Sequence, residues 1–161
     1  MKDMIKTEKE ETLVGIDIGS TTAKVVVVKD GESYKDGIEI TPEVIFEHVN
    51  AGGALCRTSA GNVNDYMELF EGYKKDYDAV IHISLGSGFS SSHQNACIAA
   101  EEFENVYVVD SMNLSTGHGL VVVEAVKMAE KGMQPKEIYD ALNELTPRIE
   151  ASFVLDRLDY M

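Results

Sequence analysis

The sequence is short of basic side chains. It has 14 lysines and arginines against 28 aspartates and glutamates, which gives a formal net charge of −14 over 161 residues. Nucleic-acid backbones and anionic membrane surfaces are bound through basic patches, so this balance argues against both as partners. It does not exclude a small anion that is held locally by N–H groups and hydroxyls.

Cysteines and long apolar runs are also scarce. The two cysteines, Cys56 and Cys97, form no CxxC pair and fit no metal-ligand spacing, which favours free, reduced thiols and predicts no metal or cofactor. No apolar run approaches the ~20 residues of a membrane span. The start, MKDMIKTEKEET, is charged rather than apolar, unlike a signal peptide. We therefore expect a cytoplasmic protein without a membrane span.

The remaining composition is that of an ordinary globular domain, with 44% hydrophobic and 26% charged residues. Residues 1–12 are expected to form a polar N-terminal segment, and residues 13–161 a single α/β domain. Strands and helices alternate along it, which predicts a mainly parallel sheet flanked by helices. The expected strands are two within 13–28 around a turn at 19–22, then 79–83, 106–109 and a doubtful one at 150–155. The expected helices cover 41–50, 63–75, 93–103, 117–131 and 134–145, with a loop at 51–62.

The most informative stretch is 79–96, AVIHISLGSGFSSSHQNA. A short buried strand ends in a loop of glycines and serines, including Gly88, Ser90 and Ser91, and a helix follows. Helix N-termini present unpaired N–H groups and a partial positive charge, and ligands of open α/β sheets lie at the carboxyl ends of strands. This pattern indicates a site for a negative group. The alternative is that the serines only cap the helix and fill a turn, and the local residues leave both interpretations open.

Six segments carry a resemblance to a known family. They are SYKDGIEITPE at 33–43, TSA at 58–60, ISLGSGFSSSHQNA at 83–96, VVDS at 108–111, STGHGLVV at 115–122 and FVLDRLDYM at 153–161. In this order they resemble the N-terminal half of the DegV family, bacterial proteins that bind fatty acids. The resemblance implies a fatty acid in a tunnel, bound by its carboxylate without chemistry. It also implies a fatty acid kinase as the partner.

The resemblance also implies the residues that hold the ligand. The family's Thr-Ser pair corresponds to Thr58 and Ser59, and the serine of its second loop corresponds to Ser90, with Ser91 and Gly88 beside it. We expect the Thr58 and Ser90 loops to open on the same carboxyl edge of the sheet, so that their hydroxyls converge near the start of the 93–103 helix.

The sequence departs from the family's pattern in two places. Residues 60–62 read Ala-Gly-Asn where the family commonly has Gln-Pro-Ser, and residues 91–92 read Ser-Ser where it commonly has Gly-Thr. The family's second domain normally follows the matched half and supplies the other wall of the tunnel. We therefore expect a second DegV-like half, or self-association, to complete the site.

A second resemblance covers only residues 14–28, VGIDIGSTTAKVVVV. This stretch looks like the first phosphate-binding hairpin of actin-like ATPases, especially the activators of 2-hydroxyacyl-CoA dehydratases. The resemblance places Asp17 near a metal–phosphate, with Gly19, Ser20 and Thr21 offering backbone N–H groups to phosphate. The alternative function is thus a nucleotide-binding ATPase or dehydratase-activator fragment, with residues 13–28 as an ATPase-like hairpin fused to the α/β domain. The other interpretation is that these residues are structural edge strands. Because that fold needs a second phosphate loop and an adenosine site, neither of which the sequence contains, we expect no nucleotide hydrolysis.

Isolated polar residues near the loops have structural explanations. We expect His82 to pack inside its strand, and His93 and His118 to be polar residues at helix starts. Asp110 and Ser111 follow the 106–109 strand and are expected to stabilise the local fold. No Ser/His/Asp spacing or GxSxG elbow of a hydrolase is present.

Overall fold

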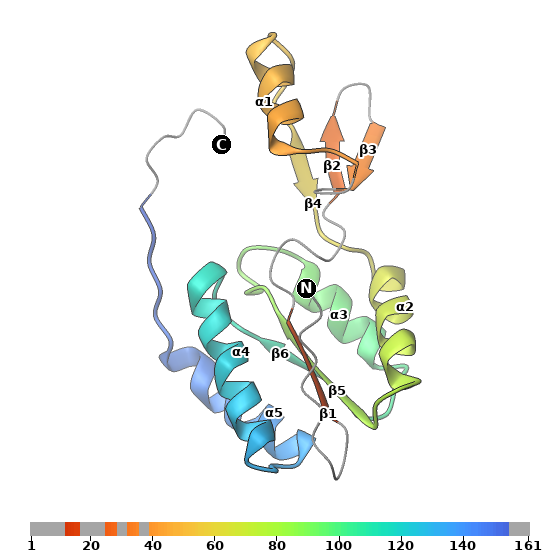
Figure 1. The fold of residues 1–161 in the computed structure, drawn as a ribbon, viewed down its shortest axis with the longest axis vertical. Coiled ribbons are helices and arrows are strands. Elements are labelled where there is room, and N and C mark those ends of the chain that lie inside the picture. Colours follow the sequence, from red (N-terminus) through yellow and green to blue (C-terminus); the bar gives the residue numbers. More distant parts are fainter. Residues whose placement is uncertain (1–11, 17–24, 29–31, 36–38, 155–161) are drawn as a thin grey trace. The chain divides into compact units, whose positions relative to one another are not determined.

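A computed structural model describes residues 12–16, 25–28, 32–35 and 39–154 (Figure 1). The chain forms two compact units. The large unit contains residues 62–151 together with the first strand, and the small unit contains the other described strands and helix before residue 62. Each unit has its own sheet.

The sheet of the large unit is entirely parallel. Its strands are β1 (Thr12–Ile16), β5 (Ala79–Ser84) and β6 (Val106–Asp110), in the order β1-β5-β6. Ile16 is level with Ile83, and Ser84 with Asp110. The carboxyl ends of all three strands therefore meet at one edge of the sheet, where α/β proteins place their ligands.

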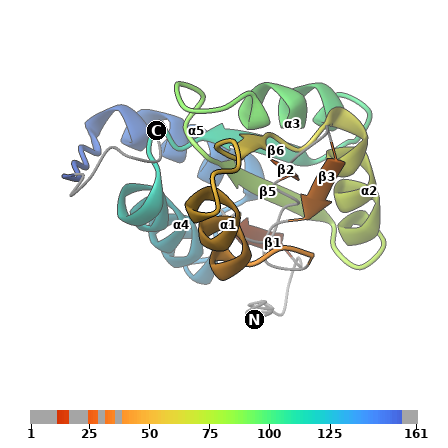
Figure 2. The same cartoon turned by 90° about the horizontal axis from the view of Figure 1, so that it is seen from above.

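Helices cover both faces of this sheet, as the large unit of Figure 2 shows. They are α2 (Val63–Lys74), α3 (Ser92–Ala100), α4 (Ser115–Glu130) and α5 (Pro135–Leu145), followed by a short 3-10 helix, Thr146–Arg148. Ile81 and Ile83 pack against α4 and α5, whereas Val80 packs against α2 and α3. The predicted α/β class with a parallel sheet flanked by helices is confirmed, and β5 is buried on both faces, as central parallel strands are.

His82 is a packed core residue, as predicted. It is 4% exposed, and its ring lies edge-on to the rings of Tyr66 and Phe70, with centroid distances of 5.5 and 5.6 Å. Edge-to-face contacts of this kind stabilise aromatic clusters. His82 therefore belongs to the core between β5 and α2.

The small unit has a second sheet that the sequence did not indicate. Its strands β2 (Val25–Val28), β3 (Glu32–Lys35) and β4 (Arg57–Ser59) are antiparallel in the order β3-β2-β4, and α1 (Pro42–Asn50) belongs to the same unit. The expectation of a loop over 51–62 is wrong at β4. Three residues are too few to show an alternating pattern, and β4 exists because β2 pairs with it.

The two strands expected within 13–28 are present but do not pair with each other. β1 pairs in parallel with β5, and β2 pairs with β3 and β4. A hairpin interpretation of this stretch is therefore wrong for the described residues, because each strand completes a different sheet. The expected turn at 19–22 lies outside the described residues.

Most helix positions are confirmed, with small shifts at the ends. α3 ends at Ala100 rather than at 103, because Phe103 follows in a turn and packs edge-on to Phe70, which imitates helical spacing in the sequence. α4 begins two residues earlier than expected. Residues 150–154 have no regular structure, because no described strand pairs with them, so a strand there is not supported.

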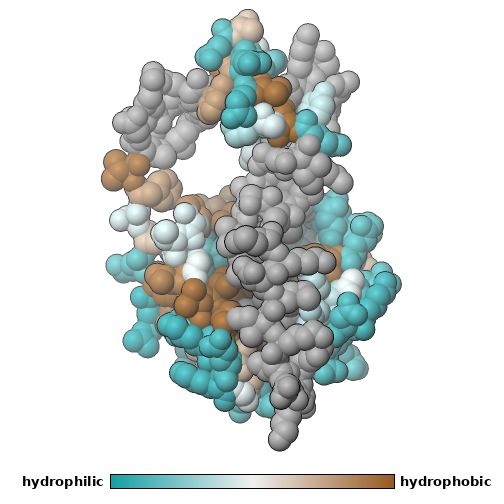
Figure 3. Space-filling model, viewed as in Figure 1, coloured by the Kyte–Doolittle hydropathy of each residue, from teal (hydrophilic) through white to brown (hydrophobic). Residues whose placement is uncertain are grey.

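Apolar side chains reach the surface on α4. Leu120 and Val123 are 56% and 48% exposed, and Figure 3 shows apolar surface gathered over this part of the large unit. Within the described ranges, no helix combines the length and the hydropathy that crossing a membrane requires.

Candidate functional site

Two loops meet at the carboxyl edge of the parallel sheet. β5 ends at Ser84, whose carbonyl accepts a hydrogen bond from the N–H of Ser111, at 3.3 Å. Further along, the N–H of Gly86 donates to the carbonyl of Asn113, at 2.9 Å. A Cβ at position 86 would lie 2.8 Å from backbone atoms of Met112 and Asn113. Only glycine allows the two loops to approach so closely.

Ser90 organises the start of α3. Its Oγ accepts the N–H of Ser92 at 3.0 Å and lies 2.8 Å from the hydroxyl oxygen of Ser92. Ser91 occupies the N-cap position, is exposed and makes no capping hydrogen bond through its side chain. The cap interpretation therefore holds for Ser90 and not for Ser91. When Ser92 donates to Ser90, the hydroxyl proton of Ser90 is available to an anion.

The tip of the loop is open. The N–H of Phe89 closes a turn on the carbonyl of Gly86 at 2.9 Å, and Phe89 is 56% exposed. A Cβ at Gly88 would have no neighbour within 4 Å. Packing does not require glycine at position 88, and its backbone faces open space.

A chain of three polar side chains links β5 to α3. The Oγ of Ser84 donates to the carbonyl of Val109 at 3.2 Å and lies 2.9 Å from Nδ1 of His93, while Nε2 of His93 lies 3.4 Å from Sγ of Cys97. Ser84 has one proton and gives it to a carbonyl, so Nδ1 of His93 must donate to Ser84. In the neutral ring Nε2 then accepts from the Cys97 thiol. His93 is thus a connector in this chain and not an unattached residue at a helix start.

The thiol of Cys97 is unsuited to act as a nucleophile. Burial raises its pKa, and the negative charges of Asp110 and Glu101 raise it further. A thiol reacts through its thiolate, so a raised pKa keeps Cys97 protonated and inert near neutral pH. This agrees with its part as a donor to His93.

Asp110 joins the two loops through one oxygen. Its Oδ1 accepts the N–H of Ser87 at 3.0 Å and the N–H of Met112 at 2.8 Å. Partial burial acts to raise its pKa, but hydrogen bonds from Ser87 and Met112, together with nearby His93, outweigh burial and lower the pKa. The carboxylate is therefore ionised at neutral pH.

The other polar residues at this edge are structural, as predicted for Ser111. Its hydroxyl is fully buried and donates to the carbonyl of Asn113 at 2.8 Å, and Asn113 in turn donates to the carbonyl of Ile149 at 3.1 Å. His118 is 3% exposed, and its Nε2 donates to the carbonyl of Ile83 at 3.2 Å. Buried polar groups of this kind are retained by hydrogen bonds to the main chain.

Thr58 and Ser59 lie in β4, paired with Val26 and Val25, and both are exposed. The premise that Thr58 belongs to the carboxyl edge of the parallel sheet is therefore wrong, because β4 belongs to the antiparallel sheet of the small unit. Successive strand residues point to opposite faces, so these two hydroxyls do not share a face. That Thr58 and Ser90 bind one ligand stays a prediction.

The residues of the alternative phosphate site, Asp17, Gly19, Ser20 and Thr21, lie outside the described residues. The strands that flank them, β1 and β2, pair with other strands. In the part of the chain that the structure describes, no group of three or more histidine, cysteine or acidic residues could hold a metal ion.

Comparisons with known proteins agree with the motifs. A model of the DegV family matches residues 17–161. A DegV domain-containing protein of Caldanaerobacter subterraneus is 36% identical over 162 residues, which cover 99% of this chain and 54% of that protein. The chain therefore belongs to the DegV family, and the resemblance inferred from the motifs is confirmed.

Two solved structures are similar in both fold and sequence. A DegV family protein of Thermus thermophilus, described as binding a fatty acid, is 30% identical with a TM-score of 0.68, over 78% of this chain and 45% of that one. DegV of Bacillus subtilis, described as a fatty acid binding protein, is 29% identical with a TM-score of 0.65, over 78% and 45%. The chain spans about half the length of the relatives that it matches.

Proposed function

We propose that this chain binds a long-chain fatty acid and holds its carboxylate at the start of α3, with Ser90 as the principal contact. One observation carries the proposal: Ser90, the residue that the family resemblance assigns to the ligand, lies two residues before α3 at the carboxyl edge of the parallel sheet and accepts the Ser92 N–H. DegV proteins that are 29–30% identical to this chain are described as fatty acid binding.

The chemistry of the loop suits a carboxylate. A carboxylate accepts several hydrogen bonds, and each is strengthened by its charge. The Ser90 hydroxyl and the N–H groups at the start of α3 offer such donors, and the helix dipole favours a negative group there. Because the whole chain carries a net charge of −14, attraction of an anion must come from these local groups.

Binding without chemistry is the function that these groups support best. Ser84 gives its proton to the Val109 carbonyl and accepts from His93, so it is not paired with a base that could activate it. Burial keeps the Cys97 thiol protonated. We infer that the bound acid is presented unchanged to a partner, for which the family resemblance suggests a fatty acid kinase.

The acyl chain needs an apolar enclosure in addition to the carboxylate site. We propose that Thr58, or its neighbour Ser59, adds a hydroxyl from the small unit. A second DegV-like half, or a second copy of this chain, would supply further walls, because the relatives are about twice as long as this chain. Sedimentation of the protein with and without oleate separates a monomer from a lipid-linked dimer.

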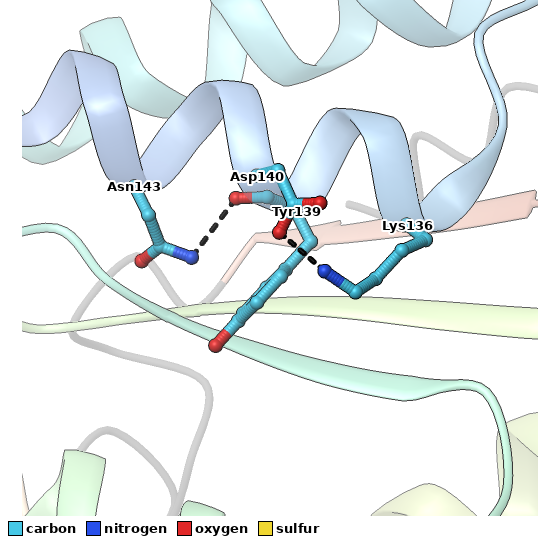
Figure 4. A network of polar contacts seen from close by, with 4 residues as sticks. All are labelled: Lys136, Tyr139, Asp140 and Asn143. Atoms are coloured by element: carbon cyan, nitrogen blue, oxygen red, sulfur yellow. Dashed lines mark hydrogen bonds and ion pairs between the residues drawn. The ribbon is translucent and has the colours of Figure 1, made fainter.

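Titration with oleate tests the site. Ser90→Ala should weaken binding by about ten- to a hundredfold, since a hydrogen bond to a charged group contributes roughly 1.5–3 kcal/mol. The matched control is Asn143→Ala on the outer surface of α5, where the amide donates only to the Tyr139 carbonyl among its described partners (Figure 4). Full affinity in Ser90→Ala would contradict the proposal.

A further inference from the structure

Resting on the proposed function, we propose that Asp110 is a positioning residue for the fatty-acid carboxylate. It holds the Ser90 loop in its binding geometry by tying the Ser87 N–H to the loop that follows β6. It does so without touching the ligand itself.

The two hydrogen bonds that Asp110 accepts, from Ser87 and Met112, are called the clamp here, and they join two segments that are far apart in sequence. Asp110 is the last residue of β6 and is level with Ser84, the last residue of β5. One carboxylate oxygen takes the Ser87 N–H from the first loop and the Met112 N–H from the second. Hydrogen bonds to an ionised acceptor are about twice as strong as neutral ones, so this is a strong connection between the loops.

The second loop needs a clamp because its backbone is strained. Met112 has φ 53°, in the left-handed region that side chains with a Cβ rarely adopt, and its side chain is 54% exposed. Packing of the side chain does not account for this conformation. The bond from the Met112 N–H to Asp110 stabilises it, and the strained backbone then forms the surface against which Gly86 fits.

The position of Ser90 depends on this assembly. Ser87 is held by Asp110, and the turn from Gly86 to Phe89 is closed by one backbone hydrogen bond. Ser90 follows this turn directly and accepts the N–H of Ser92, the first residue of α3. If Ser87 were released, the hydroxyl of Ser90 would have to be ordered when the ligand binds. Ordering a loop on binding weakens affinity, and preorganisation avoids this loss.

The test compares Asp110→Ala with Asp110→Asn in oleate titrations. Alanine removes the acceptor and should weaken binding by about tenfold, whereas the asparagine oxygen can still accept both N–H groups and should restore most of the affinity. Asp140→Ala is the control, because it removes the same charge from the surface of α5, where Asp140 pairs with Lys136 (Figure 4). Equal affinity in the wild type and Asp110→Ala, or no restoration by asparagine, would overturn the inference.

A second readout does not need the ligand. In the wild type, the amide proton shifts of Ser87 and Met112 should titrate together with Asp110, and the midpoint should lie at lower pH than that of an ordinary aspartate, because the hydrogen bonds from these residues lower the pKa of Asp110. The other titratable groups that face Asp110 are His93 and Cys97 on α3. If these two amide shifts do not respond in the acid range, the clamp is absent. If the shifts respond but the wild type binds no oleate, the clamp stands and the proposed function fails.

Discussion

At the scale of single residues, proton counting explains the polar chain beside the Gly/Ser loop. The Cys97 thiol donates to Nε2 of His93, Nδ1 of His93 donates to Ser84, and Ser84 donates to the Val109 carbonyl, so three protons serve three contacts. Each group is part-buried or buried, so a missing partner would leave a polar atom without a hydrogen bond. These hydrogen bonds therefore stabilise the junction of β5 and α3.

His93→Ala removes the middle of this chain. We expect it to lower the free energy of unfolding by about 1–3 kcal/mol, because both Ser84 and Cys97 lose a partner away from solvent. Urea denaturation monitored by circular dichroism measures the change. His48→Ala in the small unit is the comparison, because it makes the same substitution outside these hydrogen bonds. A His93→Ala protein as stable as the wild type would show that these hydrogen bonds contribute nothing to the free energy of unfolding.

The raised pKa of Cys97 predicts slow alkylation. In a Cys56→Ser protein, Cys97 should react with iodoacetamide at pH 8 more slowly than glutathione does, because only a thiolate attacks the reagent. Mass spectrometry of timed samples gives the rate. Reaction faster than that of glutathione would mean that the thiol is activated and that the site is open to a catalytic interpretation.

The two glycines of the loop form a matched pair for stability. Gly86→Ala should destabilise the protein by about 1–3 kcal/mol, because the new Cβ meets backbone at 2.8 Å, whereas Gly88→Ala has open space around it and should change stability little. Thermal unfolding of the two variants compares them directly. Equal stability of the two variants would show that the loops do not approach each other at Gly86.

At the scale of elements, the sequence predicted what regular patterns can predict. The buried run of β5 and the capped, periodic α2 and α5 appear within a residue or two of their expected bounds. β4 was not predicted because a strand of three residues shows no alternating pattern. The hydrogen bonds of Asp110 and His93 were not predicted because they join segments that lie apart in the chain. The His93–Cys97 spacing of four on one helix was the local signal that could have indicated a shared contact.

The alternation of β4 gives a prediction for binding. Thr58 and Ser59 point to opposite faces of their sheet, so only one of the two hydroxyls can make the contact that we propose for the small unit. We expect one of Thr58→Ala and Ser59→Ala to weaken oleate binding by about tenfold, and the other to leave it within about twofold. Equal losses in both variants would show that β4 is not a regular strand in the complex.

At the scale of the whole molecule, this chain corresponds to about half of its relatives, and it belongs to the DegV family over nearly its full length. The family match begins at residue 17 and so includes most of the ATPase-like stretch 14–28. The described strands of this stretch, β1 and β2, pair with β3, β4 and β5 rather than with each other. A phosphate-binding hairpin needs those two strands to pair, so this topology favours a structural part for them.

We therefore expect no measurable binding of MgATP. Calorimetric titration of the full chain should give no heat beyond dilution, because a single phosphate motif offers no adenosine site. Low-micromolar binding that Asp17→Ala abolishes would instead support the nucleotide-binding alternative.

The central claim is that Ser90 holds the carboxylate of a fatty acid, and lipid extraction tests it most directly. The wild-type protein, Ser90→Ala and Asn143→Ala are purified in parallel, and their extracts are analysed by mass spectrometry against protein concentration. We predict long-chain fatty acids in near-stoichiometric amounts from the wild type and Asn143→Ala, and strong depletion in Ser90→Ala. Two results would contradict the account. One is a wild-type protein that yields no fatty acid on extraction and also fails to bind added oleate, and the other is equal fatty-acid loading of the wild type and Ser90→Ala.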